Sequence, residues 1–309
     1  MQYQVQIKEL KTHPLKSAKA VQLSEANLTP TGIEFDRFAM LAGKTKSGEW
    51  EFISQRNFPK LALVNCSIID STNNKSANIA LNFNGESLIF DPYTPNGPNF
   101  KCSMHKSDTD SSGYEQIDVT SISPFASKLF LQSFGKIKGF EELSLVVRNK
   151  MFPRWKSKDN NIQSELSDGY PYTIQSVEDI QALNQELAEA SLPNILPESL
   201  RANIVIEGLD KKLPPLELLK GGKLYFSDTE EDFIELIKPC ARCPIPVFDQ
   251  DTAKPYMKVN QFLAILKKLN LKYLNIDKDY MNEKANYVGS RSDKIRKLKV
   301  GDILKFIVN

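Results

Sequence analysis

Residues 238–252 read KPCARCPIPVFDQDT, and they are the most informative stretch of this sequence. The apolar run at residues 233–237 precedes them as a strand would, and prolines flank the two cysteines on both sides. Because proline permits extended or turn backbone but ends a helix, Cys240 and Cys243 are expected on a rigid loop at the end of a strand. Arg242 lies between them and would favour the thiolate form of a thiol. Such a thiolate can be a nucleophile, a redox partner or a soft metal ligand.

The spacing of the two cysteines leaves other interpretations open. A structural zinc site usually needs four Cys or His ligands. The sequence has no second CxxC motif and no paired histidines, and its remaining candidates are Cys66, Cys102, His13 and His105. A thioredoxin-like motif would open a helix, which the following prolines disfavour, and the C-x4-C-x2-C run of a plant-type iron–sulfur cluster is absent. Two buried thiols packed as small apolar groups fit the spacing equally well.

Composition limits the partners of such a site. The chain has 309 residues, enough for two domains or one large one, and 40 Lys and Arg balance 38 Asp and Glu. No strong global field therefore favours nucleic acid or a membrane surface. Residues 1–7 alternate like a strand without an apolar signal core, and no stretch approaches the roughly 18 apolar residues of a membrane span. The four cysteines then predict reduced thiols in a soluble cytoplasmic protein.

The first half of the chain is predicted to be mainly β. Residues 61–69 form an apolar run of strand length. Two further runs, residues 79–83 and 88–90, flank an Asn-Gly pair at 84–85. This pair predicts a hairpin because both residues tolerate positive φ. Residues 91–113 are rich in Pro, Asn, Ser and Gly, which predicts a loop.

Helices are expected later in the chain. The first has an apolar face formed by Phe125, Leu129 and Phe130. A second begins at a capping-box-like Ser176. A third is capped by Asn260 and repeats apolar residues at the i, i+3, i+4, i+7 spacing.

Strand-like stretches alternate with these helices, at residues 143–147, 203–207, 233–237 and 303–308. No internal repeat is present. The pattern predicts a β-rich α+β protein in two parts, residues 1–120 and 121–309.

Further clusters contain residues suited to binding an anion. Lys16 and Ser17 lie on a turn after the first strand, where a cation and a hydroxyl suit a phosphate, although a solvated basic turn is the simpler interpretation. Arg37, between two aromatic residues, can hold an anion bidentately or pair with the preceding aspartate. Arg201 and Asn203 share one face as a strand begins, so both can reach one ligand.

Taken together, these clusters resemble the MOSC family, and specifically its members with a preceding N-terminal β-barrel domain, such as the bacterial YcbX proteins and the mitochondrial amidoxime-reducing component. Each motif is weak by itself, but the ordered set is specific and spans nearly the whole chain. The stretches that carry the resemblance are residues 13–19, Asp36-Arg37-Phe38, residues 52–56 with Pro59, Asp168-Gly169-Tyr170-Pro171, residues 201–204, residues 238–243 and residues 299–302.

The sequence departs from the family pattern at three positions. Ala20 stands where a glycine often follows the lysine loop, Ala202 replaces the usual proline, and Ala253 replaces the glycine that commonly ends an Asp-x-Asp-Thr-Gly stretch. None of them removes a candidate ligand, so they bear on loop geometry. The chain ends at Asn309 without the ferredoxin-like extension of some bacterial relatives, so electrons are expected from a separate protein.

The resemblance implies an N-terminal β-barrel-like domain, then a MOSC β-barrel domain with a few helices, and a bound molybdenum cofactor (molybdopterin). Molybdenum takes soft sulfur ligands, and Cys240 stands at the family's ligand position, with Cys243 beside it. Cys240 and Asp168 are the implied catalytic residues. The implied contacts to the pterin or its phosphate come from Lys16, Ser17, Arg37, Arg201 and Asn203.

The implied function is that of an oxidoreductase that reduces small N-hydroxylated compounds with electrons from a reductase or ferredoxin. One alternative is a sulfur-carrier or cofactor-handling protein with a persulfide on Cys240. Another is a non-catalytic module that binds an acidic partner through the basic run at residues 291–299, although a solvated face is the simpler interpretation of that run. Pyridoxal phosphate binding is a further association at the level of the family. No nucleic acid or membrane partner is expected.

Overall fold

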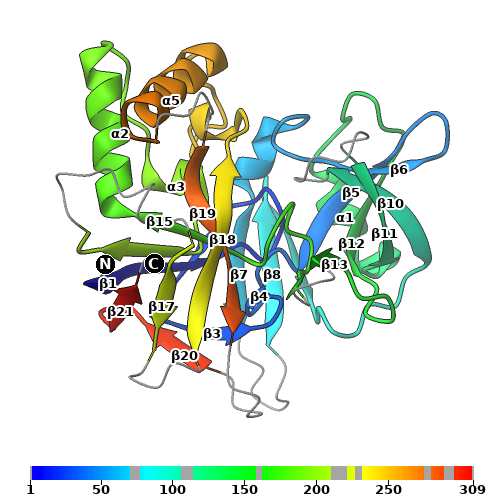
Figure 1. Cartoon of the computed structure of the whole chain (residues 1–309). Helices are drawn as coiled ribbons and strands as arrows, with labels where there is room; N and C mark the ends of the chain where they lie inside the picture. Colours follow the sequence, from blue (N-terminus) through cyan, green and yellow to red (C-terminus); the bar gives the residue numbers. More distant parts are fainter. Residues whose placement is uncertain are drawn as a thin grey trace.

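Strands dominate the computed structural model and form two barrel-like bodies that lie side by side (Figure 1). The N-terminal strand belongs to the same body as the C-terminal strand, and both chain ends are found there. The structure describes residues 2–69, 77–105, 114–157, 162–209, 221–226, 232–274, 280–288 and 296–307.

The larger body is built on an eight-stranded sheet. Strand β16 pairs with β15 at one edge and also with β1 near the other edge. This additional pairing closes the sheet into a ring, to which β2 is attached. The strands, in their order across the sheet, are β16 (Ile204–Glu207), β15 (Tyr172–Ser176), β19 (Tyr280–Val288), β18 (Phe233–Ala241), β17 (Lys223–Tyr225), β21 (Ile303–Ile307), β1 (Gln2–Thr12) and β2 (Val21–Leu23).

The smaller body contains a closed five-stranded barrel. All its neighbouring strands are antiparallel except β10 and β6, which run parallel. Its strands, in order around the barrel, are β10 (Asn99–His105), β11 (Tyr114–Ser121), β12 (Glu142–Arg148), β5 (Ala39–Lys44) and β6 (Trp50–Phe52).

Short sheets and helices cover the two barrels. Helices α2, α3 and α5 lie together at one end of the larger body (Figure 1). The small sheets are β7 (Asn65–Ile69), β8 (Asn78–Phe83) and β9 (Glu86–Phe90); β3 (Glu25–Thr29), β4 (Gly32–Ile33) and β20 (Arg296–Lys299); and β13 (Trp155–Ser157) with β14 (Ile162–Gln163). The helices among the described residues are α1 (Pro124–Gln132), α2 (Val177–Glu189), α3 (Pro197–Leu200) and α5 (Val259–Leu274), and 3-10 turns span Pro59–Leu63 and Ile245–Val247.

Apolar residues at period two fill both barrels. In β1, Val5 and Ile7 are buried while the glutamines beside them are more exposed, as expected for a strand with one face on a core. They pack in one cluster with Tyr172 of β15 and Phe306 of β21. The smaller barrel has its own interior, which includes Met104.

Several local predictions are confirmed. The hairpin of β8 and β9 turns at Asn84 and Gly85, whose φ angles are 49° and 83°. The Ser176 side chain caps α2 by accepting a hydrogen bond from the backbone N–H of Asp179 at 3.0 Å. The predicted strands at residues 143–147 and 303–308 correspond to β12 and β21.

Other predictions are wrong in detail. Residues 91–113 are not one loop, because β10 lies within them and pairs with β11; Cys102 and Met104 alternate with polar residues and face the barrel interior. The run at 61–69 is a strand only from Asn65. Helix α5 begins at Val259, so the predicted cap at 260 is a residue within the helix.

The apolar face predicted for α1 is also wrong. Only Phe130 of the three residues is buried, where it meets the ring of Phe134 at 5.2 Å. Phe125 and Leu129 are 92% and 63% exposed. The helix therefore packs through a narrower contact than its sequence suggests.

Strand pairing crosses residue 120 in both directions. Strand β1 belongs to the ring formed by residues beyond 170, and β12 completes a barrel made otherwise of residues before 122. The division into residues 1–120 and 121–309 stays a prediction.

The alanine at position 253 has a φ of 54°, in the left-handed region that glycine adopts freely. This conformation costs an alanine about 1–2 kcal/mol, and glycine loses about 0.5–1 kcal/mol more in chain entropy. We expect Ala253→Gly to raise the free energy of unfolding by about 0.5–1 kcal/mol in chemical denaturation.

The matched control is Ala188→Gly, at an exposed position within α2. There the same change should lower the free energy of unfolding by about 1 kcal/mol. Equal destabilisation by both substitutions would show that the φ at 253 carries no strain.

Candidate functional site

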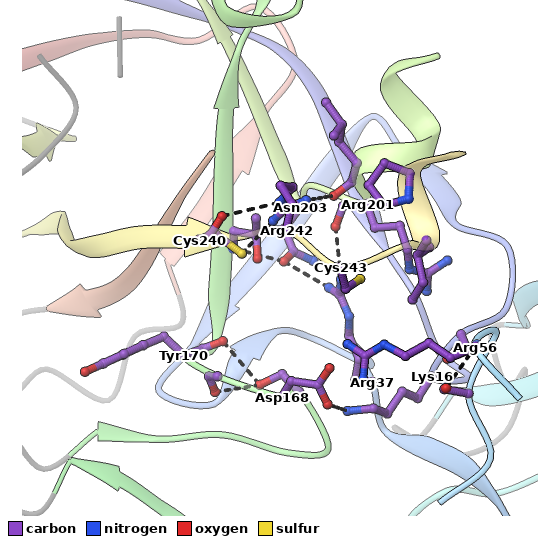
Figure 2. A pocket seen from close by; sticks show the side chains of 18 of the residues that line it. Lys16, Arg37, Arg56, Asp168, Tyr170, Arg201, Asn203, Cys240, Arg242 and Cys243 are labelled. Carbon is purple, nitrogen blue, oxygen red and sulfur yellow. Dashed lines mark hydrogen bonds and ion pairs between the residues drawn. The ribbon is translucent and has the colours of Figure 1, made fainter. Parts of the chain in front are cut away.

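One cavity of about 180 Å³ brings together all seven site residues predicted from the sequence. It lies where loops of the smaller body meet the larger one, and Figure 2 shows its lining. The seven residues are Lys16, Ser17, Arg37, Asp168, Arg201, Asn203 and Cys240. Their roles as ligands or catalytic groups stay predictions, and their common location is a fact of the structure.

Three of these residues have left-handed backbone. Ser17, Arg37 and Arg201 have φ angles of 71°, 47° and 57°, which is uncommon for residues other than glycine. Each costs of order 1 kcal/mol or more and persists only where the surroundings enforce it. Such positions cluster at binding and catalytic sites, which agrees with their place in the cavity wall.

Lys16 and Asp168 form an ion pair in the cavity wall. The ammonium Nζ lies 2.5 Å from Asp168 Oδ1 and 2.5 Å from the carbonyl oxygen of Leu166, and 4.7 Å from the ring centroid of Phe52. Burial lowers the pKa of Lys16 to about 8; Asp168 opposes this shift, and the nearby Arg154 adds to it. Lys16 is therefore a cation at neutral pH that can lose its proton in mildly basic solution.

Arg37 is held by a buried acidic partner. Its Nη1 lies 2.5 Å from Asp36 Oδ2, and Asp36 Oδ1 accepts the backbone N–H of His13 at 2.9 Å. Burial raises the pKa of Asp36, but Arg37 and His13 outweigh it, so the pKa falls below its ordinary value. Burial, with Arg37 next, lowers the pKa of His13, which is therefore neutral at neutral pH.

The Asn203 side chain makes three hydrogen bonds within the protein. Its Nδ2 donates to the carbonyl oxygen of Lys11 at 3.2 Å. Its Oδ1 accepts from Arg37 Nη1 at 3.0 Å and from the backbone N–H of Thr173 at 3.2 Å. Asn203 thus connects β1 and β15 and orients Arg37. Its predicted contact with a cofactor stays a prediction.

Arg201 adds a second buried guanidinium close to the first. It donates from Nη1 to the carbonyl oxygen of Ala18 at 2.7 Å, and its own carbonyl oxygen accepts Arg37 Nη2 at 3.0 Å. Burial first, and the charge of Arg37 second, lower the pKa of Arg201. Two neighbouring buried cations repel one another, so an anion in the cavity would stabilise both.

The structure changes the predicted setting of the two cysteines. Strand β18 extends to Ala241, so Cys240 lies within the strand and only Cys243 lies beyond it. Cys240 is 9% exposed. Arg242 turns back onto it, with Nη2 2.5 Å from Sγ and Nε 3.3 Å from the Cys240 carbonyl oxygen, while Nη1 donates to the Leu200 carbonyl oxygen at 3.2 Å. A guanidinium at this distance favours the thiolate.

The other thiols do not form a zinc site with this pair. Burial raises the pKa of both Cys66 and Cys102 to about 12, so both are protonated thiols at neutral pH. Among the residues that the structure describes, no three His, Cys, Asp or Glu side chains are grouped as metal ligands. None of the four cysteines is in a disulfide, and this includes the CxxC pair.

Sequence reasoning missed an amide pair that joins the two bodies at the cavity. Gln55 Nε2 donates to Gln250 Oε1 at 2.9 Å and to the carbonyl oxygen of Ser17 at 2.8 Å. Gln250 returns a hydrogen bond to Gln55 at 3.4 Å. Both glutamines are buried, so the pair fixes the turn at Lys16 and Ser17 against the loop that follows the cysteines.

Sequence reasoning also left Arg56 and Arg242 out of the candidate site, although both lie within stretches that carry the family resemblance. With them, the lining has five cations, and Asp168 is the only carboxylate among the described lining residues. Such a surface suits a dianionic group. It also presents one buried thiol with a cationic neighbour, a soft donor for a metal. The residues therefore fit a ligand that combines a phosphate with a sulfur-binding metal.

No helix of the described residues is long and apolar enough to cross a membrane. The predicted compartment and the association with pyridoxal phosphate stay predictions.

Comparisons with known proteins match both parts of the chain. Residues 4–132 match the MOSC N-terminal beta barrel domain, and residues 161–302 match the MOSC domain. The chain is 23% identical over 252 residues to mitochondrial amidoxime-reducing component 1 of Mus musculus. That match covers 80% of this chain and 66% of the relative, just under two thirds of its length. The solved YUAD protein of Bacillus subtilis is 11% identical, with a TM-score of 0.42 over 99% of this chain and 97% of that one.

The two domain matches occur in the predicted order and together cover most of the chain. The predicted resemblance is confirmed at this level, and so is the β-rich architecture of barrel domains with few helices. The chain belongs to the MOSC family, as a MOSC domain with an N-terminal MOSC β-barrel domain before it.

Proposed function

We propose that this protein binds a molybdenum cofactor in the cavity and reduces N-hydroxylated compounds with electrons from a separate donor protein. The observation that carries the proposal is a buried thiol, Cys240, in a cavity whose lining includes five cations and one described carboxylate. The name of the mouse relative, an amidoxime-reducing component, supports the reaction, since an amidoxime is an N-hydroxylated amidine. Membership of the MOSC family supports the cofactor.

The residues divide into those for the metal and those for the phosphate. Cys240 would supply the sulfur ligand, and Arg242 would stabilise its thiolate. Lys16 and Arg201 would hold the phosphate as charged donors, with the Ser17 hydroxyl beside them. When bound, the cofactor supplies a centre that can exchange two electrons, which no side chain here can do alone.

The reaction requires protons as well as electrons. Reducing R–NHOH to R–NH2 takes two electrons and two protons and releases one water, because the N–O bond breaks and the oxygen leaves protonated. The Lys16–Asp168 pair lines the cavity, and the Asp168 side chain is 38% exposed. It can therefore hold a proton at Oδ1 or Nζ and exchange it with solvent. Asp168 keeps its predicted catalytic role in this proposal.

The alternative function, binding of an acidic partner by the basic run at residues 291–299, has less support. Arg291 and Lys294 lie outside the described residues. Arg296 pairs with Asp232, and Lys297 and Lys299 both lie near Glu25. Those three cations are thus already paired, as expected for a solvated face. The electron donor and the cytoplasmic location belong to the proposal.

The first prediction concerns the metal. We expect the purified protein from a molybdenum-replete host to hold close to one molybdenum per chain, and Cys240→Ser to lose it, because a hydroxyl is a poor ligand for a soft site. Metal analysis by mass spectrometry measures this. Cys243→Ser is the matched control and should keep the metal. Retention in Cys240→Ser with loss in Cys243→Ser would reverse the assignment, and zinc in place of molybdenum would refute the proposal.

The second prediction concerns the pH dependence of anion binding. Lys16 is charged below a pKa of about 8 and neutral above it, so its attraction for an anion is lost as the pH rises. A hydrogen bond to a charged group contributes about 1.5–3 kcal/mol, so affinity should fall about tenfold or more. The measurement is calorimetric titration of the cofactor-free protein with sulfate, whose charge is constant from pH 7 to 9.

Two variants control this experiment. Lys16→Gln should bind sulfate weakly with a flat pH profile, and Lys16→Arg should bind it with a flat profile near the neutral-pH affinity. A wild-type affinity that does not change through pH 8 would exclude Lys16 from the anion site.

The third prediction concerns the reaction itself. Molybdenum-loaded protein with reduced methyl viologen should convert benzamidoxime to benzamidine. Liquid chromatography measures the benzamidine that is formed. The sulfur-carrier alternative predicts no turnover, together with a persulfide on Cys240 seen as a mass increase of one sulfur atom. The same sample therefore separates the two functions.

A further inference from the structure

Four of the five cations that line the cavity are held by acceptors of the protein. Carbonyl or carboxylate oxygens accept from Lys16, Arg37 and Arg201 at 2.5–3.0 Å. Arg242 is bound to the Cys240 sulfur and to two carbonyl oxygens. These side chains have fixed positions before any ligand enters.

Arg56 is the exception. Within the described part of the chain, its guanidinium contacts the thiol of Cys243 and has no hydrogen bond to a carbonyl or carboxylate oxygen. A guanidinium has five N–H donors and a thiol is a weak acceptor, so most of this donor capacity is available to a ligand. Burial lowers the pKa of Arg56, but Cys243 and then Asp168 outweigh it and raise the pKa above its ordinary value.

Arg56 also differs from the other cations in depth. It is exposed, whereas Lys16 is buried and the Arg37 side chain is only 12% exposed. Its backbone is fixed, because its N–H donates to the Ser54 hydroxyl at 3.1 Å. The residue therefore stands at the open side of the cavity on a rigid turn, close enough to Asp168 for their charges to interact.

We infer that Arg56 binds an anionic group of the substrate, so that the substrates are N-hydroxylated compounds that also carry a carboxylate or a phosphate. The deeper cations Lys16, Arg37 and Arg201 suit the cofactor. The exposed Arg56 guanidinium, near the Asp168 carboxylate, can contact a substrate that enters after the cofactor is bound. Bidentate pairing with planar or tetrahedral oxyanions is the geometry that a guanidinium favours. The N-hydroxylated reacting group comes from the proposed function, on which this inference rests. The preference for substrates with an anionic group is what the inference adds.

The test compares two compounds with the same reacting group, benzamidoxime and 4-carboxybenzamidoxime. Wild-type protein, molybdenum-loaded and chemically reduced, should show a kcat/KM about tenfold higher for the carboxylate, mainly through KM, since the carboxylate gains a charge-assisted hydrogen bond to the exposed guanidinium. Added salt should reduce the preference, because the guanidinium is exposed.

Arg56→Ala should lower the ratio of the two kcat/KM values towards one, and Arg56→Lys should keep part of it as a point charge. Lys60→Ala is the matched control, because Lys60 is an exposed cation close in sequence that is not among the cavity-lining residues. It should leave the ratio at its wild-type value. Molybdenum content is measured in each variant, and loss of metal from Arg56→Ala would assign Arg56 to the cofactor and overturn the inference.

A binding experiment separates this inference from the proposed function. Calorimetric titration with the product analogues benzamidine and 4-carboxybenzamidine needs no turnover, and the carboxylate should bind about tenfold tighter only when Arg56 is present. Turnover of both amidoximes without any preference would overturn the anion inference and leave the function standing. Arg56-dependent binding of the carboxylate without turnover of either compound would do the reverse.

Discussion

The double pairing of β1 is the constraint on which the rest of the structure depends. This strand pairs with β21 through residues 2–6 and with β16 through residues 6–10, so it closes the larger ring. The turn that follows it delivers Lys16 and Ser17 directly to the cavity, and the backbone N–H of Lys16 is fixed by the Ala39 carbonyl oxygen of the smaller body. A single segment thus joins the two bodies and places the turn at Lys16 and Ser17 between them. Any change that loosens β1 disturbs fold and site together.

The cavity is preorganised by buried charges whose mutual contacts are formed within the protein. Arg37 is tied to Asp36 and Asn203, and Lys16 to Asp168. Removing one partner of such a pair leaves an uncompensated buried charge, which typically costs about 3–5 kcal/mol. The surplus of cations is unfavourable until an anion binds. The arrangement therefore favours ligand binding over the stability of the ligand-free protein, as expected where strained backbone and perturbed pKa values coincide.

The two thiols of the CxxC motif have different neighbours and different burial. Cys240 is buried in a strand and receives the Arg242 guanidinium, while Cys243 is half-buried and contacts Arg56. The strand fixes the first thiol as a ligand-like donor deep in the cavity. The second lies closer to the opening. Two cysteines separated by two residues thus lie in different surroundings within the lining of one cavity.

The sequence by itself determined those features that depend on neighbours along the chain. The Asn-Gly hairpin, the Ser176 cap and the membership of seven residues in one site were all predictable from local patterns and from the ordered motifs. The tertiary structure alone decided the partners. Lys16 meets Asp168 across 152 residues, and Arg37 meets Asn203 across 166, so no local pattern encodes which donors remain available for a ligand. Strand β10 was not predicted for the same reason, because it forms only where the barrel interior buries Cys102 and Met104. Hydrogen-bond partners and buried faces are properties of the folded chain, and they alone show that Asn203 contacts Arg37 and that Arg56 contacts Cys243.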